Sequence, residues 1–200
     1  MNEVDHSDAV VVTDSHHSRL GDFWEHNGFK MFAIKGGLIK DAQQLLEKIN
    51  ASIFVLHLGG NDLEILEGAV VSENMQSLVK DIVARPSTRC VVTGQIIPRA
   101  SRNPKFLPRY QEYEVSFKRA SPKHHNWASD WCLDSIRQGI DKSVYFKDHT
   151  HLNSIGLDDF KNILEWVVMS INSDSFHGWS RPIVRTRQNK TDRYTAHWWF

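Results

Sequence analysis

The sequence is poor in cysteine and contains no long apolar run. Its 200 residues include two cysteines, Cys90 and Cys132, too few for the disulfide framework of a small secreted domain. Cys90 lies inside an apolar run, which predicts a small buried side chain. No apolar segment reaches the length that a membrane span requires. The N-terminal stretch MNEVDHSDAVVVTDS is acidic and is not typical of a signal peptide. We therefore expect a cytoplasmic protein without a membrane span.

The sequence also has no excess of positive or negative residues. Lys and Arg together number 24, as do Asp and Glu, so no global field attracts nucleic acid or an anionic membrane. The apolar fraction of 40% is ordinary for a globular protein. A chain of this length can bury about 70% of its unfolded surface in a single domain. These values indicate a soluble domain whose function must be read from individual motifs.

Short apolar runs alternate with amphipathic segments along most of the chain. The predicted strands are Ala9–Val12, Lys30–Ile34, Ser52–Leu58, Arg89–Thr93 and Ser143–Phe146. The predicted helices are Leu38–Ile49, Val71–Ala84 and a helix from Ser154, its N-cap, to Ile171, with Ile155 on the apolar face. This alternation predicts an α/β fold with a five-stranded, mostly parallel sheet and helices on both sides.

Two segments fall outside this alternation. Ile96–Tyr110 has three prolines and four basic residues without an acid, and either a rim or lid over the site or a solvated loop fits it. After Asn172 the periodicity stops, so we expect a domain over residues 1–171 and a docked or disordered tail over residues 172–200. The tail is basic and aromatic, which is a weak indication of nucleic-acid contact.

In parallel sheets reactive groups gather beyond the carboxyl ends of the strands, and Ser15 follows the first predicted strand. Its hydroxyl is a candidate nucleophile, and its backbone N–H would lie at a helix N-terminus, where negative charge is favoured. The alternative is that Ser15 is only a helix N-cap.

Asp148 and His151 follow the last predicted strand, three residues apart in KDHTHLNSIG. His151 would accept the proton of Ser15, while Asp148 would hold the imidazole in the required tautomer. The alternative is a helix-entry turn with a surface histidine.

Glycine-rich turns follow two further strands and supply candidate oxyanion donors. Gly59-Gly60-Asn61-Asp62 comes after a buried strand, so the Asn61 amide can point into a cleft. Gly37 precedes a helix and offers a backbone N–H that no side chain covers. With the Ser15 N–H, Gly37 and Asn61 give three predicted donors. Each turn alone is more often only a turn.

The motifs described above together resemble those of the SGNH (GDSL-type) hydrolase superfamily. Thr13-Asp14-Ser15, Gly36-Gly37, LGGND from Leu58 to Asp62, and Asp148 to His151 with Gly156 match that family's blocks in order. The resemblance implies a three-layer α/β/α, flavodoxin-like fold and hydrolysis of acetyl or other short acyl esters without metal or cofactor. It assigns the triad to Ser15, His151 and Asp148, and the oxyanion hole to Ser15, Gly37 and Asn61.

The substrate expected from this resemblance is a small-molecule or glycan acyl ester. Arg99, Arg102, Lys105 and Arg109 in the basic insertion point to an anionic or glycan leaving group. Neither the exact substrate nor the oligomeric state can be read from these residues.

Two alternatives remain at this stage. The family usually has glycine where Thr13 stands, and β-branching there could crowd the turn that presents the serine. The first alternative is therefore a scaffold that binds ligands without catalysis. A metal-dependent phosphoesterase would use Asp14 and His16, the Gly60-Asn61-Asp62 block, and His149 with His151 as ligands. Against the second alternative, the second carboxylate block of such enzymes is missing and Asp follows Asn61 where His is usual.

Overall fold

The computed structural model describes residues 5–14, 30–34, 36–94, 96–97, 99, 101–120, 127–131, 148, 150–158, 160–162 and 164. Ser15, the predicted strand Ser143–Phe146 and the tail over residues 172–200 lie outside these ranges. The predictions made for them therefore stay predictions.

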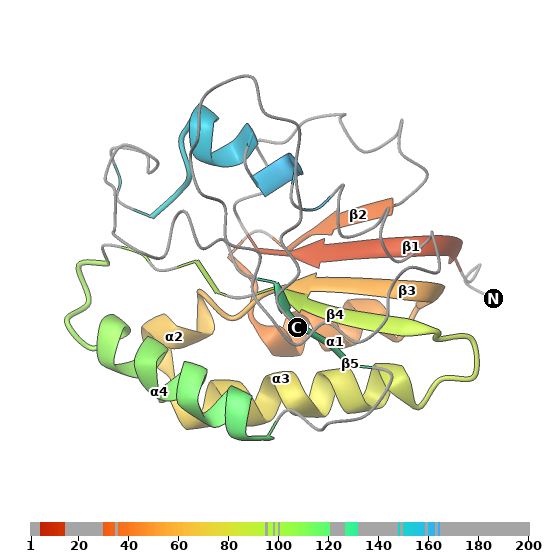
Figure 1. The fold of residues 1–200 in the computed structure, drawn as a ribbon, viewed down its shortest axis with the longest axis horizontal. Helices are drawn as coiled ribbons and strands as arrows, with labels where there is room; N and C mark the ends of the chain where they lie inside the picture. Colours follow the sequence, from red (N-terminus) through yellow and green to blue (C-terminus); the bar gives the residue numbers. More distant parts are fainter. Residues whose placement is uncertain are drawn as a thin grey trace, which may run out of the picture.

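One parallel sheet forms the centre of the molecule (Figure 1). Its strands are β1 (Asp5–Thr13), β2 (Lys30–Ala33), β3 (Ile49–His57), β4 (Cys90–Gly94) and β5 (Trp127–Trp131), in the spatial order β2-β1-β3-β4-β5. All four pairings are parallel. The α/β class with a parallel sheet is confirmed, as are the first four predicted strands. The fifth strand of the described sheet is β5, which the sequence analysis did not predict.

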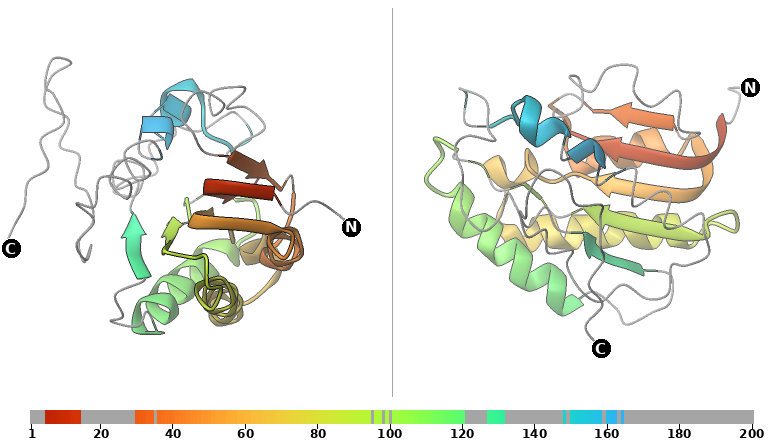
Figure 2. Two further views of the ribbon diagram at one scale, coloured as in Figure 1. Left: turned by 90° about the vertical axis from the view of Figure 1, so that its right-hand side faces the viewer. Right: turned by 45° about the horizontal axis from the view of Figure 1, so that its top comes forward.

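Helices cover both faces of the sheet. Helices α1 (Ile39–Leu46) and α3 (Gly68–Val83) pack on one face, where alternate strand residues such as Val10, Val12 and Leu56 join their core. Val11 and Val55, which point the other way, are also fully buried. The helical residues 154–158, 160–162 and 164, blue in Figure 2, lie on that second face.

Two helix boundaries differ from the prediction. Helix α1 ends at Leu46, and Ile49 begins β3 because its backbone pairs with Asp5 of β1. Helix α3 begins at Gly68, three residues before the predicted start. A Cβ on Gly68 would lie 2.0 Å from the Arg109 carbonyl oxygen, so the glycine lets the neighbouring helix approach closely.

That neighbouring helix, α4 (Phe106–Ala120), begins inside the segment predicted to be a loop. It packs beside α3 (Figure 1) and buries Phe106, Tyr113 and Phe117 in the same core. Within the insertion, the described residues before Phe106 belong to neither a helix nor a strand.

The helix predicted from Ser154 is confirmed over the described residues, which end at Leu164, but two details of the prediction were wrong. Its N-cap is Asn153 and not Ser154, because the Asn153 Oδ1 accepts the Gly156 N–H at 3.1 Å. Ile155, predicted to face the core, is 52% exposed, whereas Leu157, Phe160 and Leu164 are buried.

The strand order changes direction at one point along the carboxyl edge of the sheet. An order of 2-1-3-4-5 reverses the direction of winding between β1 and β3. In such open sheets ligands bind beyond the carboxyl ends of the strands at this reversal. Asp14 follows β1 and Gly59–Asn61 follow β3, so both predicted motifs border it.

Candidate active site

Asp148 and His151 form a hydrogen-bonded pair. The His151 Nδ1 lies 2.6 Å from the Asp148 Oδ2. The other Asp148 oxygen accepts the backbone N–H groups of Thr150 and His151, at 3.0 and 3.1 Å. In the tautomer in which Nδ1 donates to the carboxylate, the Nε2 of His151 carries the lone pair that a general base needs.

The same contacts keep Asp148 ionised. Desolvation raises the pKa of this carboxyl, but hydrogen bonds from the His151 ring and from the backbone of His151 and Thr150 outweigh it. The pKa of Asp148 is therefore held well below its ordinary value. The pair is partly accessible, with 24% of the His151 side chain and 46% of the Asp148 side chain exposed.

Asn61 lies at the start of the short helix α2 (Asp62–Ile65), directly after the glycine turn. Gly59 adopts φ +105°, a conformation that other residues rarely adopt. The turn brings the Asn61 amide beside the predicted second block, where its Nδ2 donates to the Gly37 carbonyl at 3.0 Å. An amide nitrogen carries two hydrogens, so one N–H is left over for a ligand.

Gly37 is close to Asn61, but its own N–H is engaged. That N–H donates to the Ile34 carbonyl at 3.0 Å and closes a tight turn. A Cβ on Gly37 would lie 1.9 Å from the Ile34 Cγ2, so a side chain is excluded here. The N–H that the sequence analysis assigned to the oxyanion is thus occupied, and it would have to be shared or released to serve that role.

Asp62, the last residue of the LGGND block, connects the same two loops. Its carboxylate accepts the Ile39 N–H at the start of α1, at 3.2 and 3.3 Å from the two oxygens. Only 2% of Asp62 is exposed, and this burial raises its pKa to about 6 despite the hydrogen bonds from backbone N–H groups. Asp62 and Asn61 together hold the turn after β3 against the start of α1.

The raised pKa of Asp62 predicts a pH dependence of stability. Between about pH 4 and 6 the folded state holds a proton on Asp62 that the unfolded state has lost, so rising pH costs stability in this window. Relative to Asp62→Asn, the wild-type protein is expected to lose up to about 3 kcal/mol of unfolding free energy between pH 4 and 7. Urea unfolding of both proteins across this range measures the difference. A difference that does not change with pH would contradict the assignment.

The end of β1 is regular up to Asp14. Thr13 is fully buried and continues the parallel pairing, with its carbonyl accepting the Ile34 N–H at 2.9 Å. The Asp14 N–H donates to the His57 carbonyl at 3.3 Å. Thr13 thus fits the strand, and its β-branched side chain does not interrupt pairing on either side.

Arg99 is a member of this site that the sequence analysis did not identify as one. It was grouped with the basic insertion, yet only 5% of it is exposed. Its Nη2 lies 3.3 Å from the Asp14 Oδ2, and both terminal nitrogens donate to the Asn61 Oδ1, at 3.3 and 3.4 Å. The one available signal was its place two residues beyond a buried apolar segment that follows β4.

The two parts of the site lie at the same edge of the sheet. The Phe160 ring, in the helix that follows His151, stands edge-on to His57, with ring centroids 4.9 Å apart. His57 is the last residue of β3, four residues before Asn61. The structure therefore links Asp14, Gly37, Asn61 and Arg99 by direct contacts. It also packs the helix that follows the Asp148–His151 pair against the end of β3. Ser15 lies outside the described residues.

The metal-site hypothesis has little support in the described residues. No group of three His, Cys, Asp or Glu side chains in the described part of the chain could hold a metal ion. His16 and His149 lie outside that part. Asp14, the first proposed ligand, is already paired with a cation, the Arg99 guanidinium.

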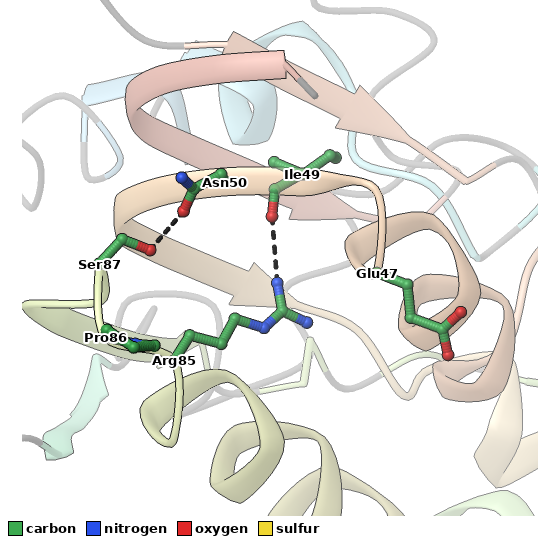
Figure 3. Close-up of a pocket in the computed structure, with 6 residues that line it drawn as sticks. All are labelled: Glu47, Ile49, Asn50, Arg85, Pro86 and Ser87. Atoms are coloured by element: carbon green, nitrogen blue, oxygen red, sulfur yellow. Dashed lines mark hydrogen bonds between the residues drawn. The ribbon is translucent and has the colours of Figure 1, made fainter. Parts of the chain in front are cut away.

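A surface hollow of about 580 Å³ lies away from this site (Figure 3). It is lined by Glu47, Ile49, Asn50, Arg85, Pro86 and Ser87, at the amino end of β3. Arg85 Nη1 donates to the carbonyls of Leu46 and Ile49, at 2.8 and 3.1 Å. Arg85 thereby caps the carbonyl end of α1 and has a structural role.

Two other predictions bear on the described residues. Cys90 is buried, and desolvation raises its pKa to about 11, as expected for an unreactive thiol. None of the helices described here is long and apolar enough to cross a membrane.

Comparison with known proteins identifies the fold. No protein-family model matches the sequence, and no curated protein matches it. Among solved structures, a carbohydrate esterase family 3 protein from Talaromyces cellulolyticus superposes with a TM-score of 0.65 at 13% identity, covering 84% of this chain and 99% of that one. The lipase/acylhydrolase from Enterococcus faecalis gives 0.60 at 12% identity, covering 82% and 96%. A member of the lipolytic protein G-D-S-L family from Veillonella parvula gives 0.59 at 11% identity, covering 86% and 100%. The chain has the fold of the SGNH (GDSL-type) hydrolases.

Proposed function

We propose that this protein is a serine esterase that hydrolyses short acyl esters. The observation that carries the proposal is the Asp148–His151 pair, with its 2.6 Å hydrogen bond, just before the helix whose Phe160 packs against His57 at the end of β3. Asn61, on the turn after that strand, supplies an amide with one N–H available. The similarity in fold to esterases and acylhydrolases supports the same reaction class.

In the proposed mechanism Ser15 attacks the acyl carbonyl while His151 takes its proton. Asp148, which stays ionised, orients the imidazole and stabilises the imidazolium. His151 then protonates the leaving alcohol and later activates the water that hydrolyses the acyl-enzyme. No metal or cofactor takes part.

The oxyanion would be bound by the second Nδ2–H of Asn61 and the Ser15 N–H. Gly37 would join them once its N–H is shared with or released from the Ile34 carbonyl. Each such donor contributes about 2.7–4 kcal/mol of transition-state stabilisation in a comparable hydrolase.

The substrate is proposed to be a small-molecule or glycan acyl ester. Of the four basic residues of the insertion, Arg99 and Arg109 are buried and paired with Asp14 and Glu67. Only Arg102 and Lys105 remain exposed for an anionic leaving group. This reduces the weight of the anionic hypothesis and leaves neutral acetyl esters as the first compounds to try.

A fluorophosphonate probe tests the proposal directly. We expect covalent labelling of Ser15, located by peptide mapping, and hydrolysis of p-nitrophenyl acetate that a chelator does not reduce. Longer p-nitrophenyl esters should be hydrolysed more slowly. Absence of both labelling and turnover would favour a binding protein, and loss of turnover with the chelator would favour a metal enzyme.

A further inference from the structure

We infer that Arg99 is a positioning residue that fixes the Asn61 amide for oxyanion binding and joins it to Asp14, the residue that precedes Ser15 in the sequence. The inference rests on the proposed function for its catalytic consequence, but the hold on Asn61 can be measured independently of any reaction. A single guanidinium reaches both loops: Asp14 at the end of β1 and Asn61 on the turn after β3.

The chemistry of arginine decides which way the Asn61 amide faces. A guanidinium has donors only, so the amide atom that faces both of its terminal nitrogens must be the oxygen. The NH₂ group is then directed to the opposite side, where it meets the Gly37 carbonyl. A reversed amide would bring its NH₂ group against the Arg99 donors and its oxygen against the Gly37 carbonyl.

The guanidinium also strengthens Asn61 as a donor. Polarisation of the carbonyl by a cation increases the positive charge on the amide hydrogens, as in other chains of hydrogen bonds. The contacts of 3.3–3.4 Å are long for charge-assisted hydrogen bonds, because one group is shared between Asn61 and Asp14. Glu64 lies nearby as well, at 3.9 Å from Nη1.

Arg99 also compensates a buried charge next to Ser15. Asp14 is 2% exposed, and its Oδ2 lies 3.3 Å from the Arg99 Nη2. Without the guanidinium, a buried carboxylate would stand one residue from the proposed nucleophile and oppose the negative charge of the transition state. The pair thus removes an electrostatic obstacle to the reaction.

Gly60 of the LGGND block is explained by the same contact. A Cβ on Gly60 would lie 2.1 Å from the Arg99 Nη2 and 3.1 Å from the Asp14 Oδ2. The absent side chain lets the guanidinium lie directly over the turn. Gly59 permits the backbone conformation of the turn, and Gly60 leaves room for the Arg99 guanidinium.

Arg109 is a matched control in the same insertion. It is also buried, and it also donates to the segment after Asn61, at the carbonyls of Leu63 and Glu64. Its carboxylate partner is Glu67, and no hydrogen bond joins it to Asn61 or Asp14 in the described part of the chain. Loss of Arg109 should therefore destabilise α2 without turning the Asn61 amide.

Steady-state kinetics on p-nitrophenyl acetate separate the two arginines. We expect Arg99→Met and Arg99→Lys to lower kcat about 10- to 100-fold with KM little changed, less than the loss of a whole donor. Arg109→Met should lower Tm but leave kcat of the folded protein unchanged. Added guanidinium ion should raise the kcat of Arg99→Ala and not that of Arg109→Ala. Wild-type kcat in a folded Arg99 variant, or equal losses in both series, would overturn the inference.

A double variant covers the case in which Arg99→Met does not fold. Asp14→Asn/Arg99→Met leaves no uncompensated buried carboxylate, so it should fold and still show the reduced kcat. Arg99→Lys keeps the charge beside Asp14 but cannot reach both loops with a planar fork.

Side-chain amide NMR tests the hold on Asn61 without any substrate. The Asn61 NH₂ signals are identified as the pair that Asn61→Asp removes. In wild-type protein and Arg109→Met we expect them shifted from free asparagine and protected from exchange, and in Arg99→Met we expect both features lost. Unchanged signals in Arg99→Met would disprove the positioning role even if the protein hydrolyses no ester, whereas an inactive wild type with these amide changes would disprove only the esterase proposal.

Discussion

Replacement of Ser15 by alanine is expected to lower kcat for p-nitrophenyl acetate by at least about 10⁴-fold, with KM little changed. The variant keeps the proposed oxyanion donors and the backbone of the strand end but has no atom to form the acyl-enzyme. Stopped-flow and steady-state assays measure the loss, and fluorophosphonate labelling should disappear with it.

The control for this variant is a serine far from the carboxyl edge of the sheet, where the proposed catalytic motifs lie. Ser87 lies at the amino end of β3, where its hydroxyl bonds to Asn50 (Figure 3). Ser87→Ala should retain wild-type kcat and labelling. More than a tenth of wild-type turnover in Ser15→Ala would remove Ser15 from the nucleophile role.

His151→Ala is expected to reduce kcat by a similar factor, about 10⁴-fold or more, because the base and the later acid are lost together. Asp148→Asn should cost nearly as much, since an amide at the same place favours the wrong imidazole tautomer. Circular dichroism and Tm establish that each variant is folded before its kinetics are compared.

His149→Ala provides the internal control for that loop. His149 is two residues from His151, and the structure pairs His151 with Asp148 at 2.6 Å. We expect His149→Ala to keep wild-type kcat. If His149→Ala were inactive and His151→Ala active, the assignment of the base would be wrong by two residues.

The prediction of strands was correct where the sequence contains a continuous run of buried apolar residues. The central strands β1, β3 and β4 are covered on both faces, so each contains a short apolar segment without interruption, over residues 9–12, 53–56 and 90–92. Strand β5 reads Trp-Ala-Ser-Asp-Trp and lies at the edge of the described sheet. Edge strands tolerate polar residues, so no apolar run marks this one.

Helix α4 was missed because of its proline. Pro108 is the third residue of the helix, and proline is tolerated in the first turn because the N–H groups there have no partner within the helix. The same residue, read with Pro98 and Pro104, indicated an irregular loop. The hydrophobic positions Phe106, Tyr110, Tyr113 and Phe117 recur at spacings of three and four, a pattern that the loop interpretation overlooked.

The contacts of the site could be predicted where the residues are close in sequence or follow the ends of predicted strands. The Asp148–His151 contact spans three residues, and the pairing of Asn61 with Gly37 follows from the ends of two strands. The partner of Asp14 is 85 residues away, and nothing in a single sequence marks one arginine among four as the buried one. The occupied N–H of Gly37 depends on the exact turn, which composition does not determine.

The attachment of the insertion to α2 bears on how this protein could be recombined with others of the same fold. The Asn103 amide and the Arg109 guanidinium both donate to the Glu64 carbonyl, at 2.7 and 2.9 Å. The Glu112 carboxylate accepts the Gly68 N–H at 2.9 Å. Residues 59–68 and 99–112 would therefore have to be exchanged together in a chimera. If only one of the two segments were replaced, hydrogen-bond donors and acceptors of the other would lose their partners.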